Sequence, residues 1–284
     1  MHVQHFFDQL TSTLTYVVHD ERTRTGVVID PVLDFDPRRG RTSEESCAAV
    51  ARYIQAHDLT IPYVLDTHVH ADHFSGMAYF KRLYNAKTVI GRHILQVQSR
   101  FRDLYHLGPT FPTDGRQFDL LVRDGDVLEA GELRIKALHT PGHTPACITY
   151  QTGDALFVGD VLFMPDYGTA RCDFPGGSAE VLYESIQRLY GFPDDTRLFT
   201  CHDYQPGGRP LRWESTVGDQ RRANTQLNAA TTKEEFVAFR TRRDLTLTLP
   251  AFILPSLQVN IRAGCLPEPE NNGITYLKIP LNVF

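Results

Sequence analysis

Short apolar runs separated by turn residues dominate the first two thirds of the chain. The runs at 13–18 and 26–30 are rich in β-branched and aromatic residues, and a charged stretch joins them, so we expect a β-hairpin there. An apolar run after Pro62 predicts a buried strand. From Phe118 onward the pattern is again typical of strands, in FDLLV, ELRIKALH, ACITYQ, DALFVGD and TRLFTCHD.

Helical spacing of apolar residues appears between and after these strands. Thr42 and Glu45 fit a capping box at the start of a helix that carries Val50 and Ile54 on one face. Strand-like runs followed by helices, twice over, predict an α/β protein with helices outside its sheets. Further helices are expected at 76–85, 93–106, 178–191, 215–228 and 233–243, and a final β-like run at 274–281.

Length and charge narrow the class of protein. The 284 residues, 42% of them hydrophobic, suffice for a substantial core. We expect one domain over 1–284, with a helical and extended segment from about residue 205. The net charge of -5 gives no indication of a nucleic-acid or membrane-surface partner. The apolar tail from Leu249 to Phe284 either covers the core or forms a homodimer contact.

Cysteine usage and hydropathy point to a soluble protein of a reducing compartment. The five cysteines are far apart and form no CxxC pair, which argues against a disulfide framework or a zinc knuckle. No apolar run approaches the roughly 18 residues that a membrane span needs. The N-terminus lacks the pattern of a signal peptide, so we expect a cytoplasmic location.

Four of the strand-like runs end in metal-ligand residues. Such residues just past buried strands would meet at one edge of a sheet assembly, on a rigid scaffold. This density of histidine and aspartate predicts a metal site. The residues are His68, His70, Asp72 and His73 after the first run, His143 after the second, Asp160 after the third and His202 after the fourth.

The spacing within THVHADH favours convergence. Residues i and i+2 of an extended segment point the same way, so His68 and His70 can face one pocket. Asp72 and His73 are expected where the chain turns into a helix. Gly142 allows a sharp turn or a close approach of the backbone before His143. These residues alone do not separate a site for one metal from a site for two.

The motifs THVHADHFSG, HTPGHTPACITY and GDVLFMPDYGTARCDF together resemble the metallo-β-lactamase superfamily over roughly residues 10–205. The resemblance implies an αββα sandwich with the site at the shared edge of two sheets. Val69 stands where glyoxalase II has a third consecutive histidine, and Arg171 with Asp173 and Phe174 resembles the RxDF stretch of persulfide dioxygenases. The chain is similar to the bacterial dioxygenases that lack a rhodanese domain.

This family relation implies one Fe(II) per chain, bound by His68, His143 and Asp160. Such a triad leaves positions open for substrate, water and O2. Four further residues, which would orient the ligands and hold waters in catalysis, are His70, Asp72, His73 and His202. The implied activity is oxidation of glutathione persulfide by O2 and water to sulfite and glutathione. The alternative is a dinuclear hydrolase of glutathione thioesters, like glyoxalase II.

Glutathione carries two carboxylates, so its binding site should offer a cation. Arg171 is the main candidate, and Tyr204 is a candidate hydrogen-bond donor to the substrate. Arg209 and Arg221 are secondary candidates. Cys172 is either a thiol that exchanges persulfide or a buried, inert residue, and we favour the inert one.

Overall fold

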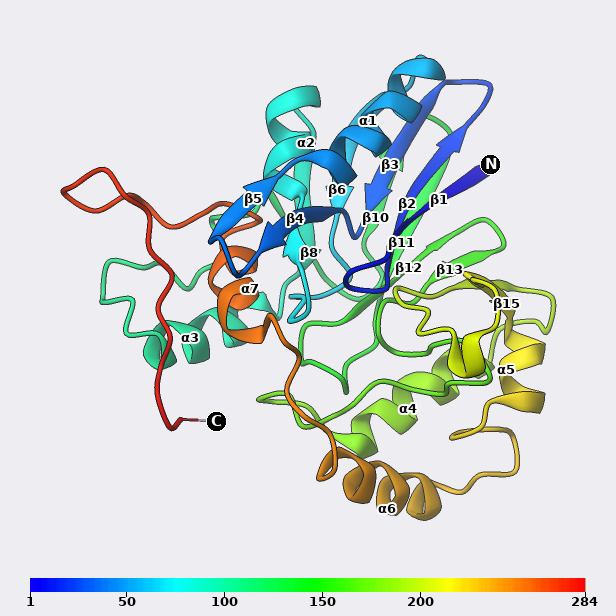
Figure 1. Ribbon diagram of the computed structural model, residues 1–284. Helices are drawn as coiled ribbons and strands as arrows, with labels where there is room; N and C mark the ends of the chain where they lie inside the picture. Colours follow the sequence, from blue (N-terminus) through cyan, green and yellow to red (C-terminus); the bar gives the residue numbers. More distant parts are fainter. Residues whose placement is uncertain (284) are drawn as a thin grey trace.

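The computed structural model describes residues 1–283 and shows two six-stranded sheets face to face, with helices outside both (Figure 1). The first sheet has the order β1-β2-β3-β6-β8-β9. The β2–β3 hairpin is antiparallel, and β3, β6, β8 and β9 run parallel. Its strands are β1 (His2–Asp8), β2 (Thr13–Asp20), β3 (Thr25–Ile29), β6 (Thr60–Leu65), β8 (Lys87–Gly91) and β9 (Leu120–Val122).

The second sheet has the order β10-β11-β12-β13-β14-β15 and is antiparallel except for the β13–β14 pair. A third, small sheet has the strand order β5-β4-β7. The second sheet comprises β10 (Val127–Ala130), β11 (Leu133–His139), β12 (Ile148–Thr152), β13 (Ala155–Phe157), β14 (Arg197–Phe199) and β15 (Glu214–Thr216), and the small sheet β4 (Val32–Asp36), β5 (Arg41–Ser43) and β7 (Phe74–Ser75).

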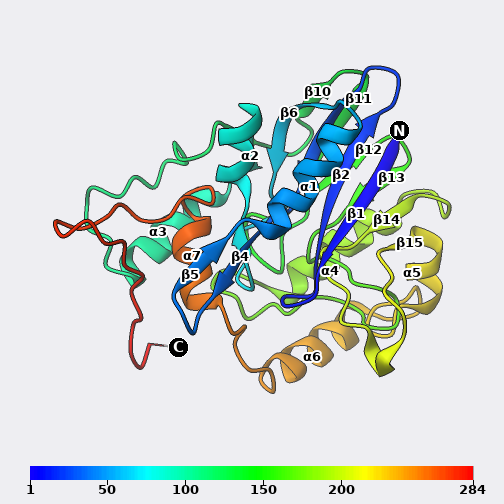
Figure 2. The same cartoon turned by 45° about the horizontal axis from the view of Figure 1, so that its top comes forward.

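The helices form the two outer layers, which the turned view in Figure 2 separates. None of the helices within residues 1–283 is long and apolar enough to cross a membrane. Beside the first sheet lie α1 (Glu45–Ala56), α2 (Met77–Tyr84), α3 (Ile94–Leu104) and α7 (Ile253–Asn260); beside the second lie α4 (Ala179–Tyr190), α5 (Val217–Ala223), α6 (Lys233–Asp244) and the short 3-10 helix η1 (Pro206–Gly208).

Period-2 alternation explains how the sheets pack. In β2, Leu14, Tyr16 and Val18 face the second sheet, whose Phe157 and Phe199 belong to the same buried cluster. Other side chains of the first sheet face its helices, and those of the second sheet face α4. Three buried clusters thus separate four layers, and the predicted αββα sandwich is confirmed.

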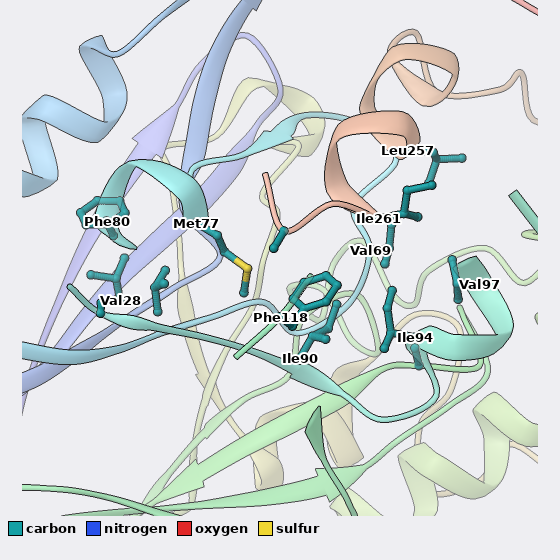
Figure 3. Close-up of a cluster of buried hydrophobic side chains, with 14 of the residues drawn as sticks. Val28, Val69, Met77, Phe80, Ile90, Ile94, Val97, Phe118, Leu257 and Ile261 are labelled. Carbon is teal, nitrogen blue, oxygen red and sulfur yellow. The ribbon is translucent and has the colours of Figure 1, made fainter. Parts of the chain in front are cut away.

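The cluster under the first sheet reaches from the sheet to the C-terminal helix (Figure 3). Val28 and Ile90 of the sheet, Met77 of α2 and Leu257 of α7 belong to it. Val69 is buried in the same cluster, although it lies between two histidines of the predicted metal motif. The hydrophobic core therefore fixes the metal motif through the buried side chain of Val69.

Three local expectations are wrong, and one strand is unexpected. Thr42 pairs with Phe35 in β5, so α1 begins after Glu44 without a side-chain cap. Residues 274–281 form no strand, and β1, which the sequence analysis did not predict, extends the first sheet by pairing with β2. Asp72 and His73 precede β7 rather than opening a helix, because α2 begins only at Met77.

Gly142 adopts a φ of +137°, and a Cβ there would clash with the backbone N and Cα of Leu182 at the start of α4. We expect Gly142→Ala to lower the free energy of unfolding by about 3 kcal/mol, because backbone strain and overlap add. Gly125→Ala is the matched control, since Gly125 has a φ of +86° but open space around it; about 1 kcal/mol is expected there. Urea unfolding measures both, and equal effects would contradict the close contact.

Candidate metal centre

Four strands bring the predicted ligands to one edge shared by the two sheets. The segment 66–73 follows β6, His143 lies in the loop between β11 and β12, and Asp160 and His202 follow β13 and β14. The start of β2 ties the edges together: Leu14 N donates to Cys201 O at 2.7 Å. Residues from both sheets can therefore share one site.

Thr67 determines which nitrogen of His68 faces this site. The Thr67 hydroxyl donates to Oδ2 of Asp30 at 2.9 Å, so its oxygen accepts the Nδ1–H of His68 at 3.0 Å. A neutral imidazole with its proton on Nδ1 carries the lone pair on Nε2. His68 thus presents Nε2 as a ligand atom.

Asp30 orients His70 in the same manner. Its Oδ1 accepts the backbone N–H of Thr67 at 2.7 Å and the Nε2–H of His70 at 3.0 Å, which leaves the Nδ1 lone pair of His70 for the site. Asp30 is not among the residues predicted from the sequence. It nevertheless follows the buried run of β3, as the predicted ligands follow their strands.

Backbone carbonyls orient the histidines of the second sheet. His143 donates from Nδ1 to Arg171 O at 2.7 Å, and His202 donates from Nδ1 to Ser12 O at 3.2 Å. Both therefore present Nε2 to the site. His68 Nε2 and His143 Nε2 each lie 3.8 Å from Asp160 Oδ2, and His202 Nε2 lies 3.4 Å from Asp160 Oδ1.

Burial and neighbouring charges hold His68, His70 and Asp72 in their metal-binding forms. Burial, reinforced by His70, lowers the pKa of His68 well below its ordinary value, and burial with His73 does the same to the pKa of His70. For Asp72, burial acts in the opposite direction, but His202 and His73 hold its pKa well below the usual range. Neutral imidazoles and an ionised carboxylate are the forms that bind a cation.

Several buried atoms of the site lack a hydrogen-bond partner within residues 1–283. Unpartnered buried polar atoms are rare and costly in folded proteins. A metal ion satisfies such lone pairs, so the donor set fits a bound metal. The atoms are His68 Nε2, His70 Nδ1, His73 Nε2, His202 Nε2 and Asp160 Oδ1.

The predicted ligands fall into overlapping groups. Ligand atoms of His68, His143 and Asp160 lie within 4.8 Å of one another, and so do those of His70, Asp72 and His73. The predicted triad is therefore brought together, and the other predicted residues adjoin it. A third group joins Asp160 and His202 with Cys201, which the sequence did not predict and whose pKa is raised well above its ordinary value by burial.

A cavity of about 530 Å³ opens in front of the centre. His143, Asp160 and Asp72 line it on the metal side, together with Tyr204. Tyr204 is 41% exposed, but partial burial of its ring and the carboxylates of Asp160 and Asp72 raise its pKa above the ordinary value, so its hydroxyl keeps the proton and can donate into the cavity. Tyr204 therefore lies where a substrate donor was predicted.

The predicted arginines differ in their surroundings. Arg171 lines the cavity, but its guanidinium forms a bidentate pair with Asp173 and donates to Thr248 O at 2.6 Å. Arg209 pairs with Asp166 and Asp203, and Arg221 with Asp194. Neither of these two lines the cavity. The buried Cys172 has its pKa raised by burial, as expected of an inert thiol.

Asn260 of α7 fixes the backbone of the segment 70–75, which carries three of the predicted site residues. Its Nδ2 donates to the carbonyls of His70 and His73, both at 2.8 Å, and its Oδ1 accepts the backbone N–H of Ser75 at 2.8 Å. Asn260 is buried. The sequence carries no signal for this role, because the contacting residues lie 185 or more positions apart.

Comparison with known proteins identifies the family of this chain. The model of the metallo-β-lactamase superfamily matches residues 9–202, which include every predicted ligand. The chain belongs to the metallo-β-lactamase superfamily. A probable metallo-hydrolase of Burkholderia pseudomallei is 50% identical over the full length of both chains. Curated relatives described as β-lactamase hydrolase-like proteins are longer, and the chain spans 65% of their length.

Within this superfamily, persulfide dioxygenase homologues support the predicted family. The human mitochondrial persulfide dioxygenase ETHE1 is 30% identical, over 92% of this chain and 88% of its own. The crystal structure of ETHE1 from Myxococcus xanthus superposes with a TM-score of 0.75 at 31% identity, over 93% of this chain and 100% of that one. The family predicted from the motifs is thereby confirmed.

Replacement of one predicted ligand tests the metal centre of this superfamily member. We expect His68→Ala to weaken metal binding by more than the roughly 10–100-fold that loss of an outer partner costs. His57→Ala removes an exposed imidazole from the end of α1 and should leave metal content unchanged. Elemental analysis after dialysis gives the readout. Full metal content in His68→Ala would exclude His68 as a ligand.

Asn260→Ala tests the support from α7. It leaves two carbonyls and one N–H buried without partners, so we expect a loss of about 3 kcal/mol in unfolding free energy. We also expect a metal affinity about 10-fold weaker. Asn272→Ala, at an exposed position of the tail, is the control. Unchanged metal affinity in a destabilised Asn260→Ala protein would show that α7 supports the fold but not the ligands.

Proposed function

We propose that this protein is a persulfide dioxygenase, which converts glutathione persulfide, O2 and water into glutathione and sulfite at one Fe(II). The observation that carries the proposal is the grouping of His68, His143 and Asp160, with the last two lining the cavity. Two histidines and one carboxylate with open positions are typical of non-haem iron oxygenases. The 30% identity to human persulfide dioxygenase supports the same activity.

In this proposal His68, His143 and Asp160 hold the metal. The bound Fe(II) would supply electrons to O2 and a position for the terminal sulfur of the persulfide. The apolar side of the cavity, with Phe163 and Phe252, limits the access of water to the reacting atoms. Tyr204 orients the substrate through its protonated hydroxyl.

His202 is the proposed proton donor. Its Nε2 lies 3.3 Å from Asp72 Oδ2 and 3.4 Å from Asp160 Oδ1. Before a cation binds, burial lowers the pKa of His202, but Asp160 and Asp72 outweigh it and leave that pKa raised. A bound Fe(II) would take up the charge of Asp160, so Asp72 is the carboxylate that keeps favouring the protonated imidazole. Cleavage of the sulfur–sulfur bond leaves a glutathione thiolate that takes up one proton, and His202 can supply it.

A second candidate function is hydrolysis of glutathione thioesters with two metal ions. The unpartnered Nε2 atoms of His73 and His202, beside Asp72, favour it because they offer ligands for a second ion. The name of the Burkholderia relative, a probable metallo-hydrolase, agrees with such an activity. In the dioxygenase proposal Asp72 and His73 instead hold waters and orient the ligands, and His202 supplies a proton. A homodimer and a cytoplasmic location remain predictions from the sequence.

Anaerobic purification followed by an oxygen-electrode assay separates the two functions. We expect about one iron per chain, because two members of the group His68, His143 and Asp160 line the cavity but only Asp72 of the second group does. We also expect O2 consumption on addition of glutathione persulfide. S-lactoylglutathione should not be hydrolysed. Two zinc ions per chain, thioester hydrolysis and no O2 uptake would overturn the dioxygenase in favour of the hydrolase.

A further inference from the structure

The cavity in front of the metal centre carries three arginines but only two carboxylates, Asp72 and Asp160. Both carboxylates belong to the metal centre. The arginines are Arg171, Arg240 and Arg243, and they come from the segment after Asp160 and from α6. A cavity-lining arginine that has no carboxylate partner suits an anionic substrate. The three arginines differ in how many of their donors are already occupied.

Two of them are occupied by the protein itself. Arg171 donates from Nε and Nη2 to Asp173 and from Nη1 to Thr248 O. Arg240 is fully buried and bonds Asp244 from Nε and Nη2, while its Nη1 donates to Thr169 O and Gln226. An incoming carboxylate would have to displace these bonds. Both arginines therefore stabilise the wall of the cavity and do not offer free donors to a substrate.

Arg243 is different. It lies in the last turn of α6, is half-buried and lines the cavity, and within residues 1–283 its guanidinium has no hydrogen-bond or ion-pair partner in the protein. Half-burial limits solvent screening, so a carboxylate that enters the cavity gains a charge-assisted, bidentate contact there.

We propose that Arg243 determines substrate specificity by binding a carboxylate on the thiol part of the substrate. Arg171 then acts as a positioning residue. Its guanidinium holds Thr248 in the α6–α7 connection, which forms one side of the cavity, while its carbonyl orients His143. The inference rests on the proposed function and adds to it the residue that selects persulfides of carboxylate-bearing thiols, such as glutathione, over neutral ones.

A binding experiment tests this role without turnover. Isothermal titration calorimetry compares S-methylglutathione with its diethyl ester, in which both carboxylates are masked, on the metal-loaded protein. We expect the wild type to bind the acid about 10-fold or more tightly than the ester. Arg243→Gln should bind both compounds equally, and Arg243→Lys should keep part of the preference.

Arg242→Gln is the matched control, because Arg242 is the neighbouring residue of α6, is exposed and does not line the cavity. It should keep the full preference for the acid. The proposal is overturned if Arg243→Gln retains the preference, if Arg242→Gln loses it equally, or if the wild type does not bind S-methylglutathione.

The same variants separate this inference from the proposed reaction. S-methylglutathione is inert to both O2 chemistry and thioester hydrolysis, so its binding reports only on recognition. Absence of O2 uptake with glutathione persulfide would refute the dioxygenase and leave the Arg243 result standing. Normal O2 uptake with no loss of acid preference in Arg243→Gln would refute the role of Arg243 alone.

Discussion

The site depends on five ligand-type atoms at the shared edge of the sheets, which are buried and have no hydrogen-bond partner among residues 1–283. Each would carry a desolvation cost in a protein that binds no cation. The surrounding hydrogen bonds orient the imidazoles so that their lone pairs face the site. Asp30 orients His70 and Thr67 orients His68, while backbone carbonyls orient the imidazoles of the second sheet. A metal held by His68 and Asp160 converts this cost into binding energy at two of the five atoms, and waters or a second ion satisfy those of His70, His73 and His202.

The fold and the grouping of the ligand-type residues were predictable because both follow from local patterns. Alternation in β2 and β3 separates the side chains facing the second sheet from those facing the helices, and polar residues after buried strands meet at a common edge. Even the HVH sequence obeys this rule, since Val69 enters the core while His68 and His70 face the site.

What the sequence did not reveal depends on contacts between distant segments. Asn260 holds a loop that lies 185 or more residues before it, and Arg243 enters the cavity because the connection after α6 passes in front of the centre. No periodicity encodes either contact. The capping box failed for a similar reason: pairing of Thr42 with Phe35 took precedence over the local helix signal. The C-terminal helices, outside the family match, thus support the ligands and shape the cavity.

The central claim is that one metal, held by three protein ligands, keeps positions open for both substrate and O2. Nitric oxide, an O2 surrogate, can be added anaerobically to the Fe(II)-loaded protein and followed by electron paramagnetic resonance. The account predicts a high-spin iron–nitrosyl signal whose intensity equals the iron content and whose shape changes when glutathione persulfide is added. A silent, coupled pair of irons, or a signal that the persulfide leaves unaltered, would contradict it.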